Sequence, residues 1–498
     1  MSTSHKDPEG VPQSTDEGMA RATSLGAIVS LASVLSSVLR SKVAAIALGA
    51  TGVGVAAEIQ QLVAVANVPA SAFAGTALTV ALGEAQSGRR AILPGRVATI
   101  AISWSVVLSM VFGVICVFCS NALLPREWLG ESRALLAMAT LGAVGSAALS
   151  VALTTIVFSG DLRSSALIQA AQSVTAAIAA FALTLPFGLW GFFLGVAITP
   201  WVGIAFAARF LKRKPGLFTP IERPALPFWY LKHGVRIGAA SLVAGGALQS
   251  ALFVVRTSLN AHGGAELNGQ FQAAWAVGST YLSVVLGGLG GFVFPRFAGA
   301  RTRSELSTEV TAAATFILDL SIPATVLVIA NRSWIIQALY SDKFVVASEI
   351  LGWQVCGDVL RSLAWVYAGP ILLRGRVLGF VFTELVAASL FAGFTWARTP
   401  HVGAIAPGQA YLISYIGYLA STALVLRFSE GVKFKPQHIM TAVGITAGLA
   451  LFVGFGEPGG GLARALLFVI GLVLFARTRF AVGVFHSMRR LLARRFGF

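Results

Sequence analysis

Charged side chains are scarce in this chain. Only 11% of its 498 residues are Asp, Glu, Lys or Arg, whereas a soluble globular chain carries about 25%. Such a chain cannot cover a water-facing surface with charge, and its hydrophobic content reaches 56% with a mean hydropathy of +0.79. Lipid is the solvent that suits this composition, since a spanning helix needs about 20 apolar residues. The apolar runs are continuous, which excludes the short alternating strands of an outer-membrane barrel.

Signatures of catalysis and of metal binding are also missing. The 6 His form no HExxH pair and no cluster, and the sequence contains no P-loop, nucleotide fingerprint or GxSxG elbow. Cys116 and Cys119 form a CxxC inside the apolar run "GVICVFCS", where two small buried side chains are a simpler interpretation than a redox pair. We therefore expect no enzyme activity, no catalytic residue, no metal, no cofactor and no disulfide framework.

Long apolar runs recur along the whole chain. We predict an all-α integral membrane protein of about fourteen transmembrane helices. The predicted spans cover roughly residues 22–48, 56–82, 95–120, 132–158, 162–184, 187–210, 230–258, 268–297, 305–330, 345–372, 376–396, 407–427, 437–455 and 459–476. The polar N-terminus lacks a basic segment followed by a short apolar one, so no cleaved signal peptide is expected.

Basic residues gather in alternate loops. One set of loops holds Arg89, Arg90, Arg96, Arg209, Lys212, Arg213, Lys214, Arg296, Arg301, Arg303, Arg374, Arg376, Arg427, Lys433 and Lys435. The loops between them are nearly bare, so the positive-inside rule places both termini in the cytoplasm. Topology therefore explains most of the net charge of +17, and no nucleic acid partner is expected.

The longest basic loop divides the chain into two halves. The predicted organisation is a disordered cytoplasmic N-terminus (1–21), an N-terminal six-helix bundle (22–210), a cytoplasmic linker (211–229), a C-terminal six-helix bundle (230–427), helices 13 and 14 (428–476) and a basic cytoplasmic tail (477–498). A weak repeat supports this division, because the stretch from Ser30 aligns without gaps on the stretch from Ser241. Repeats of equal topology are related by an axis along the membrane normal, as in transporters.

Ionisable residues inside the predicted spans are the candidate functional groups, because charge in a bilayer is costly. Arg40, Lys42, Arg256 and Arg361 are predicted to line a cationic cavity that replaces water around an anionic headgroup. The acids Asp319, Asp358, Glu384 and Glu58 are candidates for ion coupling. Simpler interpretations stay open: Arg40 and Lys42 could extend to the lipid headgroups, and Asp358 could neutralise Arg361 one turn away.

Three stretches carry a resemblance to a known family. They are "LRSKVAAIALGATGVGVAAEIQQ", "NGQFQAAWAVGSTYLSVVLGGLGGFVFPRF" and "LGWQVCGDVLRSLAWVYAGPILLRGR". They resemble the oligosaccharide flippases of the multidrug/oligosaccharidyl-lipid/polysaccharide exporter superfamily, above all the O-antigen and enterobacterial common antigen translocases (Wzx type). The polar and aromatic positions that match include Gln61, Gln272, Trp275 and Tyr281. Ser279 departs from the family, which has an acid there, so a proton-coupling function at that position is in doubt.

The resemblance implies a fold, a cargo and partners. It implies two six-helix bundles in a V shape with two further C-terminal helices, working by alternating access as a monomer. The implied cargo is an undecaprenyl-diphosphate-linked oligosaccharide repeat unit for O-antigen and lipopolysaccharide synthesis, moved from the cytoplasmic to the periplasmic leaflet of a bacterial inner membrane. Membrane lipids surround the protein, and a polymerase and chain-length proteins of a polysaccharide pathway are candidate partners.

Other functions are compatible with the same features. A multidrug exporter of this fold would favour an acidic cavity for cationic cargo, whereas the candidate residues here are mainly basic. A lipid II flippase would carry the same lipid diphosphate and differ only in the sugar. A membrane-embedded polysaccharide polymerase or ligase usually has a large extracytoplasmic loop, and the corresponding loops here are short.

Overall fold

Helices account for the regular structure of the computed structural model. It describes residues 14–74, 78–79, 81–82, 94–124, 129–212, 228–455 and 460–478, and no strand occurs within these ranges. Eight helical segments of the described residues are long and apolar enough to cross a membrane. The all-helical prediction is therefore confirmed, while the count of about fourteen spans stays a prediction. Arg89 and Arg90, most of the 211–229 linker and the tail beyond residue 478 lie outside the described residues.

The first half of the chain begins with a helical hairpin. α1 (Ser14–Ala66) is broken at Gly49, whose φ of 65° and ψ of −173° are not helical. It starts within the stretch predicted to be disordered, of which residues 1–13 lie outside the described part. The elements that follow are α2 (Val68–Ala74), α4 (Pro94–Phe118), α5 (Ser120–Leu123), α6 (Leu129–Phe158), α7 (Leu162–Ala179), a π-helical turn η2 (Ala180–Thr184) and α8 (Leu185–Leu211).

The second half begins in the same way. α9 (Phe228–Gly299) has 72 residues, and a straight helix of that size would be about 108 Å long, far beyond the roughly 30 Å of a bilayer core. It folds back at Gly264, with φ 66° and ψ −172°. The later elements are α10 (Arg303–Leu339), η3 (Asp342–Phe344), α11 (Val345–Leu373), α12 (Val377–Val402), η4 (Gly403–Ile405), α13 (Ala406–Glu430), α14 (Pro436–Gly454) and α15 (Gly460–Arg477).

The breaks in the two halves repeat at a constant spacing. Three pairs of glycines with positive φ are each 215 residues apart: Gly49 and Gly264, Gly160 and Gly375, Gly188 and Gly403 (264 minus 49, 375 minus 160, 403 minus 188). The sequence alignment of Ser30 with Ser241 implies 211, four residues fewer. Residues four apart lie on the same helix face, so an alignment of Ala-rich helices can slip by one turn and still match in pattern.

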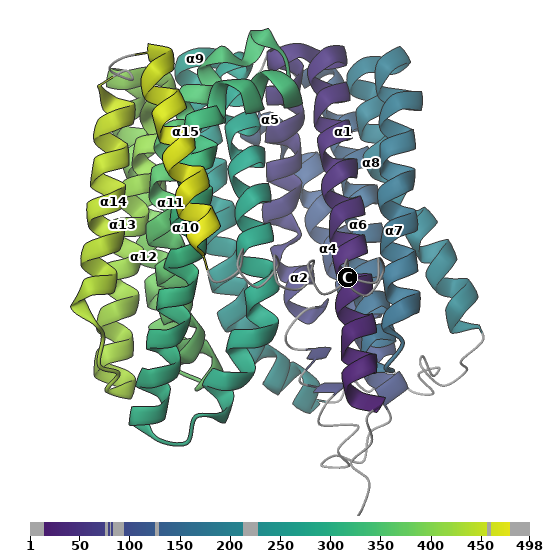
Figure 1. Cartoon of the computed structure of the whole chain (residues 1–498). Helices are drawn as coiled ribbons and strands as arrows, with labels where there is room; N and C mark the ends of the chain where they lie inside the picture. The colour runs from purple at the N-terminus through teal and green to yellow at the C-terminus, as the bar shows by residue number, and fades with distance from the viewer. Residues whose placement is uncertain are drawn as a thin grey trace, which may run out of the picture.

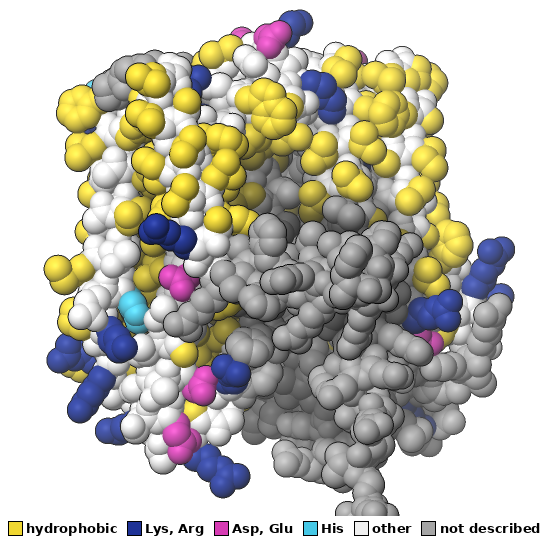
Figure 2. All heavy atoms as spheres, viewed as in Figure 1, with side chains coloured by type: hydrophobic (Ala, Val, Ile, Leu, Met, Phe, Trp, Pro, Cys, Tyr) yellow, Lys and Arg dark blue, Asp and Glu magenta, His cyan; other side chains and the backbone are white. Residues whose placement is uncertain are grey.

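The two halves stand side by side and meet where α1 packs against α9. In Figure 1 the two arms of α1 join at the top, α6, α7 and α8 lie on the right, and α10 to α15 lie on the left. We call the top of this view the upper end and the bottom the lower end. The surface suits lipid, with Phe118 80% and Leu378 85% exposed. Figure 2 shows apolar side chains over most of the upper part, a few charged ones near the top edge and more charged ones toward the lower end.

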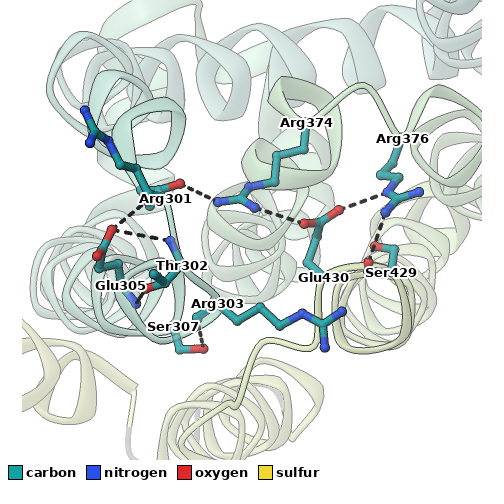
Figure 3. Close-up of polar contacts among 10 residues, drawn as sticks. Arg301, Thr302, Arg303, Glu305, Ser307, Arg374, Arg376, Ser429 and Glu430 are labelled. Carbon is teal, nitrogen blue, oxygen red and sulfur yellow. Dashed lines mark hydrogen bonds and ion pairs between the residues drawn. The ribbon is translucent and has the colours of Figure 1, made fainter.

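A buried carboxylate holds the lower end of the second half together. Glu430, at the end of α13, accepts hydrogen bonds from Arg376 Nε at 2.9 Å and from Arg374 Nη1 at 3.3 Å. Arg374 also donates through Nη2 to the carbonyl of Ala300 at 2.7 Å, as Figure 3 shows. The sequence assigns these two arginines to topology alone. In the structure they also connect the loop between α11 and α12 with the end of α13 and, through Arg374, with the loop between α9 and α10.

Glycine allows the close approach of α1 and α9. A Cβ on Gly54 would lie 1.8 Å from the carbonyl oxygen of Ala265, and a Cβ on Gly269 would lie 1.9 Å from that of Ala50. Gly54 and Gly269 are themselves 215 residues apart, as are Ala50 and Ala265. The contact between the halves is therefore reciprocal, with backbone against backbone, and small residues of this kind are typical of helix packing in membranes.

We expect Gly269→Ala to weaken this contact. The new methyl group would overlap the Ala50 carbonyl, and overpacking of this kind costs about 1–3 kcal/mol of unfolding free energy. Gly245→Ala is the matched control, since a Cβ there meets nothing within 4 Å. Thermal unfolding of the purified protein in detergent should show a lower midpoint for Gly269→Ala alone. Equal midpoints for the two variants would contradict the close crossing.

Candidate functional site

A cavity of about 360 Å³ opens between the two halves. Its wall is built mainly from α1, α7, η2 and α8, with Gln272 and Ala276 of α9 and Tyr340 contributed by the second half. Its polar side chains include Arg40, Ser37, Ser41, Gln60, Gln172 and Gln272. The wall therefore offers hydrogen-bonding groups from both halves of the chain.

Arg40 is the cation on this wall. Its side chain is exposed even though it lines a cavity, and none of the described residues pairs with its guanidinium. The described residues of the wall include no Asp or Glu. Arg carries a permanent charge and a forked set of donors that match phosphate or carboxylate. The cavity is therefore suited to an anion.

Lys42 and Gln61 connect the halves instead of lining the cavity. Lys42 Nζ donates to the carbonyls of Tyr340 at 2.5 Å and Gln337 at 3.2 Å, at the C-terminal end of α10, where unpaired carbonyls and the helix dipole favour a cation. Gln61 Nε2 donates to the backbone and side-chain oxygens of Gln249, both at 2.8 Å. The two side chains are thus links from α1 to α10 and from α1 to α9.

Arg256 does not line the cavity but contacts Gln272, which does. It is 3% exposed, and it donates to Asn268 Oδ1 at 2.9 Å and to Gln272 Oε1. Asn268 Nδ2 in turn donates to Glu58 Oε2 at 3.3 Å and to the carbonyl of Gly54 at 3.0 Å. Asn268 therefore bridges the predicted cation Arg256 and the predicted acid Glu58, which come from different halves.

A second polar network is buried within the second half. Asp358 is 1% exposed and accepts hydrogen bonds from the hydroxyls of Tyr281 and, at 2.7 Å, Tyr411. Arg361 donates to the same Tyr411 hydroxyl at 2.7 Å. The spacing of Asp358 and Arg361 suggests that they neutralise each other, and in the structure the Tyr411 hydroxyl bridges the two side chains.

Tyrosines extend this network along α13. Tyr411, Tyr415 and Tyr418 stand at i, i+4 and i+7, which places them on one helix face, and Tyr418 donates to Glu384 at 2.6 Å. The guanidinium of Arg361 lies 5.4 Å from the centre of the Tyr415 ring. Arg361, Glu384 and all three tyrosines line a pocket of about 140 Å³.

Two candidates remain, Trp275 and Asp319. Trp275 also lines the pocket of about 140 Å³ and stacks on Phe391, with ring centres 6.0 Å apart. Asp319 is exposed and lines a separate pocket with Arg296, Glu309 and Lys435. The structure therefore does not bring it to the other three acids predicted for ion coupling. The predicted site residues did not include Asn268, Tyr411, Tyr415 and Tyr418. Only the i, i+4, i+7 spacing of the tyrosines could have indicated the latter three.

We expect Tyr411→Phe to destabilise the second half. The change removes the hydroxyl that joins Arg361 to Asp358, and hydrogen bonds to buried charged groups are worth about 1.5–3 kcal/mol each. Tyr367→Phe is the control, because the buried Tyr367 hydroxyl has no hydrogen-bond partner in the described part of the chain. Thermal unfolding in nanodiscs should show a loss for Tyr411→Phe and none for Tyr367→Phe. The reverse order would refute the network.

Two curated proteins resemble the chain in sequence. The Lipid III flippase of Escherichia coli (strain K12) is 24% identical over 415 residues, which cover 81% of this chain and 96% of that protein. The Lipid III flippase of Shigella flexneri gives the same values. No protein-family model matches the chain.

Solved transporter structures resemble it in fold. Lipid II flippase MurJ in an inward closed conformation matches with a TM-score of 0.68 and 11% identity, over 96% of this chain and 100% of that one. The inward-facing conformation of a MATE family multidrug resistance transporter of the MOP superfamily matches with a TM-score of 0.62 and 15% identity, over 84% and 96%. The chain is therefore a multi-pass membrane protein with the helical fold that MurJ and the MATE transporters share.

Proposed function

We propose that the chain is a flippase for an undecaprenyl-diphosphate-linked oligosaccharide repeat unit. It would move this cargo from the cytoplasmic to the periplasmic leaflet of a bacterial inner membrane by alternating access. The observation that carries the proposal is the cavity between the halves, where Arg40 has no partner among the described residues and no described acid lines the wall. The similarity in sequence to Lipid III flippases and in fold to MurJ supports it.

The chemistry of the wall matches the two polar parts of such a cargo. A diphosphate that enters hydrocarbon without a counter-charge costs several kcal/mol or more, and Arg40 supplies a fixed positive charge. The amides of Gln60 and Gln172 and the nearby serine hydroxyls both donate and accept hydrogen bonds, as sugar hydroxyls require. The lipid tail would stay outside, along the apolar surface.

The contacts at the upper end support alternating access. α1 and α9 cross in backbone contact at Gly54 and Gly269, and Lys42 joins α1 to the end of α10. With both termini in the cytoplasm, as the basic loops predict, this closed end would face the periplasm. We propose that the two six-helix bundles separate here to release the cargo and that the protein works as a monomer.

The alternatives differ in cargo. A lipid II flippase fits the same geometry, because its cargo has the same lipid diphosphate, and the MurJ fold supports it equally. A multidrug exporter is supported by the MATE fold, but a cavity wall whose described residues include Arg40 and no acid suits cationic drugs poorly. Complementation of cells that lack each flippase, scored by the lipid-linked sugar that accumulates inside, would separate these cargoes.

We expect Arg40→Gln to reduce flipping of a polyprenyl-diphosphate oligosaccharide by about tenfold or more. Loss of a charged hydrogen-bonding partner costs about 1.5–3 kcal/mol, and Gln is a shorter side chain that keeps hydrogen-bond donors without the charge. The exposed Arg398→Gln is the control. The measurement is the initial rate in proteoliposomes, with the cargo in the outer leaflet detected by a lectin. Flipping by Arg40→Gln at the wild-type rate would remove the basis of the proposal.

Membrane potential should drive the export. Outward movement of about two negative charges gains roughly 4–5 kcal/mol at 100 mV, inside negative, so an added proton or sodium coupling through Asp358 or Glu384 is not required by the energetics. We expect net flipping in proteoliposomes to rise with an imposed potassium diffusion potential and to survive Glu384→Gln. Net export that is unchanged when both the potential and the proton gradient are collapsed would exclude both driving forces.

A further inference from the structure

Gln272 has only one chemically sensible orientation. Its Oε1 accepts a hydrogen bond from Arg256 Nη2, and a guanidinium has donors but no acceptor. The amide oxygen must therefore face Arg256, and the NH₂ group faces away from it. Gln272 is part of the cavity wall, and no described residue accepts a hydrogen bond from its Nε2. Within the described part of the chain, the NH₂ group is thus an unpaired donor on a residue of the cavity wall.

Arg256 is itself held in place. Its guanidinium lies 5.4 Å from the centre of the Phe271 ring and donates to Asn268 Oδ1. Asn268 is 0% exposed, and its NH₂ group reaches the carbonyl of Gly54 and the carboxylate of Glu58 on α1. Both side-chain amides in this network have a single orientation. The acceptors on α1 fix the NH₂ group of Asn268, and the guanidinium of Arg256 fixes the amide oxygens of Asn268 and Gln272.

We propose that Gln272 contacts the cargo as a hydrogen-bond donor and that Arg256 is a positioning residue that fixes the direction of this donor. The inference rests on the proposed function. The ligand chemistry is an acceptor oxygen, supplied either by the diphosphate or by a sugar. Gln272 belongs to the second half and Arg40 to the first, so the cargo would be held from both sides of the cavity.

This arrangement ties cargo binding to the state of the upper end. Asn268 reaches its two acceptors on α1 only while α1 and α9 are in contact. When the halves separate there, Asn268 loses both acceptors, and the hydrogen bonds that hold Arg256 and Gln272 weaken. The donor is therefore best ordered while the upper end is closed, and its disorder on opening favours release of the cargo.

The test measures flipping rate against cargo concentration in proteoliposomes, with polyprenyl diphosphates that carry fluorescent oligosaccharides. Gln272→Glu keeps an acceptor for Arg256 but presents only acceptors to the cavity. We expect its apparent KM to rise by roughly tenfold or more, while the maximal rate and the thermal midpoint stay near the wild-type values. Gln437→Glu, the same change at an exposed position of α14, should leave all three values unchanged.

A double-mutant cycle separates positioning from simple structural support. Arg256→Met should raise the apparent KM, and the Arg256→Met/Gln272→Leu double variant should be no worse than Gln272→Leu alone, because Arg256 acts through Gln272. Additive effects would overturn the positioning function. A wild-type KM for Gln272→Glu would overturn the donor function while leaving the proposed flippase intact.

Two further outcomes are informative. If the wild-type protein flips none of the polyprenyl-diphosphate oligosaccharides, the proposed function fails and this inference fails with it. A sugar-free polyprenyl diphosphate, added as a competitor, identifies the acceptor oxygen. Weaker competition in Gln272→Glu than in the wild type would assign the contact to the diphosphate, and equal competition would assign it to the sugar; either result with a raised KM supports the donor.

Discussion

The reciprocal contact of α1 with α9 is the constraint on which the other features depend. Gly54 and Gly269 let the two backbones approach until neither position has room for a Cβ. This approach brings the carbonyl of Gly54 within 3.0 Å of the Asn268 amide, and Asn268 then connects Glu58 with Arg256. It also closes the upper end above a cavity to which both halves contribute. A wider crossing would leave the central polar groups buried without partners, which costs about 1–3 kcal/mol for each group.

The two buried networks solve the problem of charge in a membrane in different ways. In the second half, tyrosine hydroxyls surround Asp358, and Tyr411 passes the interaction on to Arg361. These groups hydrogen-bond to one another within one half, so their contacts do not depend on the position of the other half. The central network crosses from one half to the other through Asn268. Its hydrogen bonds therefore depend on the relative position of the halves, as the proposed alternating access requires.

Composition and periodicity predicted where helices lie along the chain, but they could not predict which side chains meet between helices. The predicted spans 95–120 and 345–372 correspond to Pro94–Phe118 and Val345–Leu373, because apolar length sets a spanning helix directly. Arg256 could not be placed by the same reasoning, since its burial depends on Asn268, twelve residues further along a folded-back helix. The repeat was found in a register one turn away from the 215-residue spacing of the glycines, because the hydrophobic pattern alone does not distinguish positions four residues apart.

The four cations predicted for one cavity differ in their partners within the structure. Lys42 is bound to carbonyls at the end of α10, Arg256 to two amides, and Arg361 to a tyrosine. A cation at membrane depth is costly unless it is paired, and these three side chains have partners within the protein. Arg40 has none in the described part of the chain and faces the open space of the cavity. Because the forked donors of Arg favour phosphate and carboxylate, we propose that an anionic headgroup pairs with Arg40 when cargo is bound.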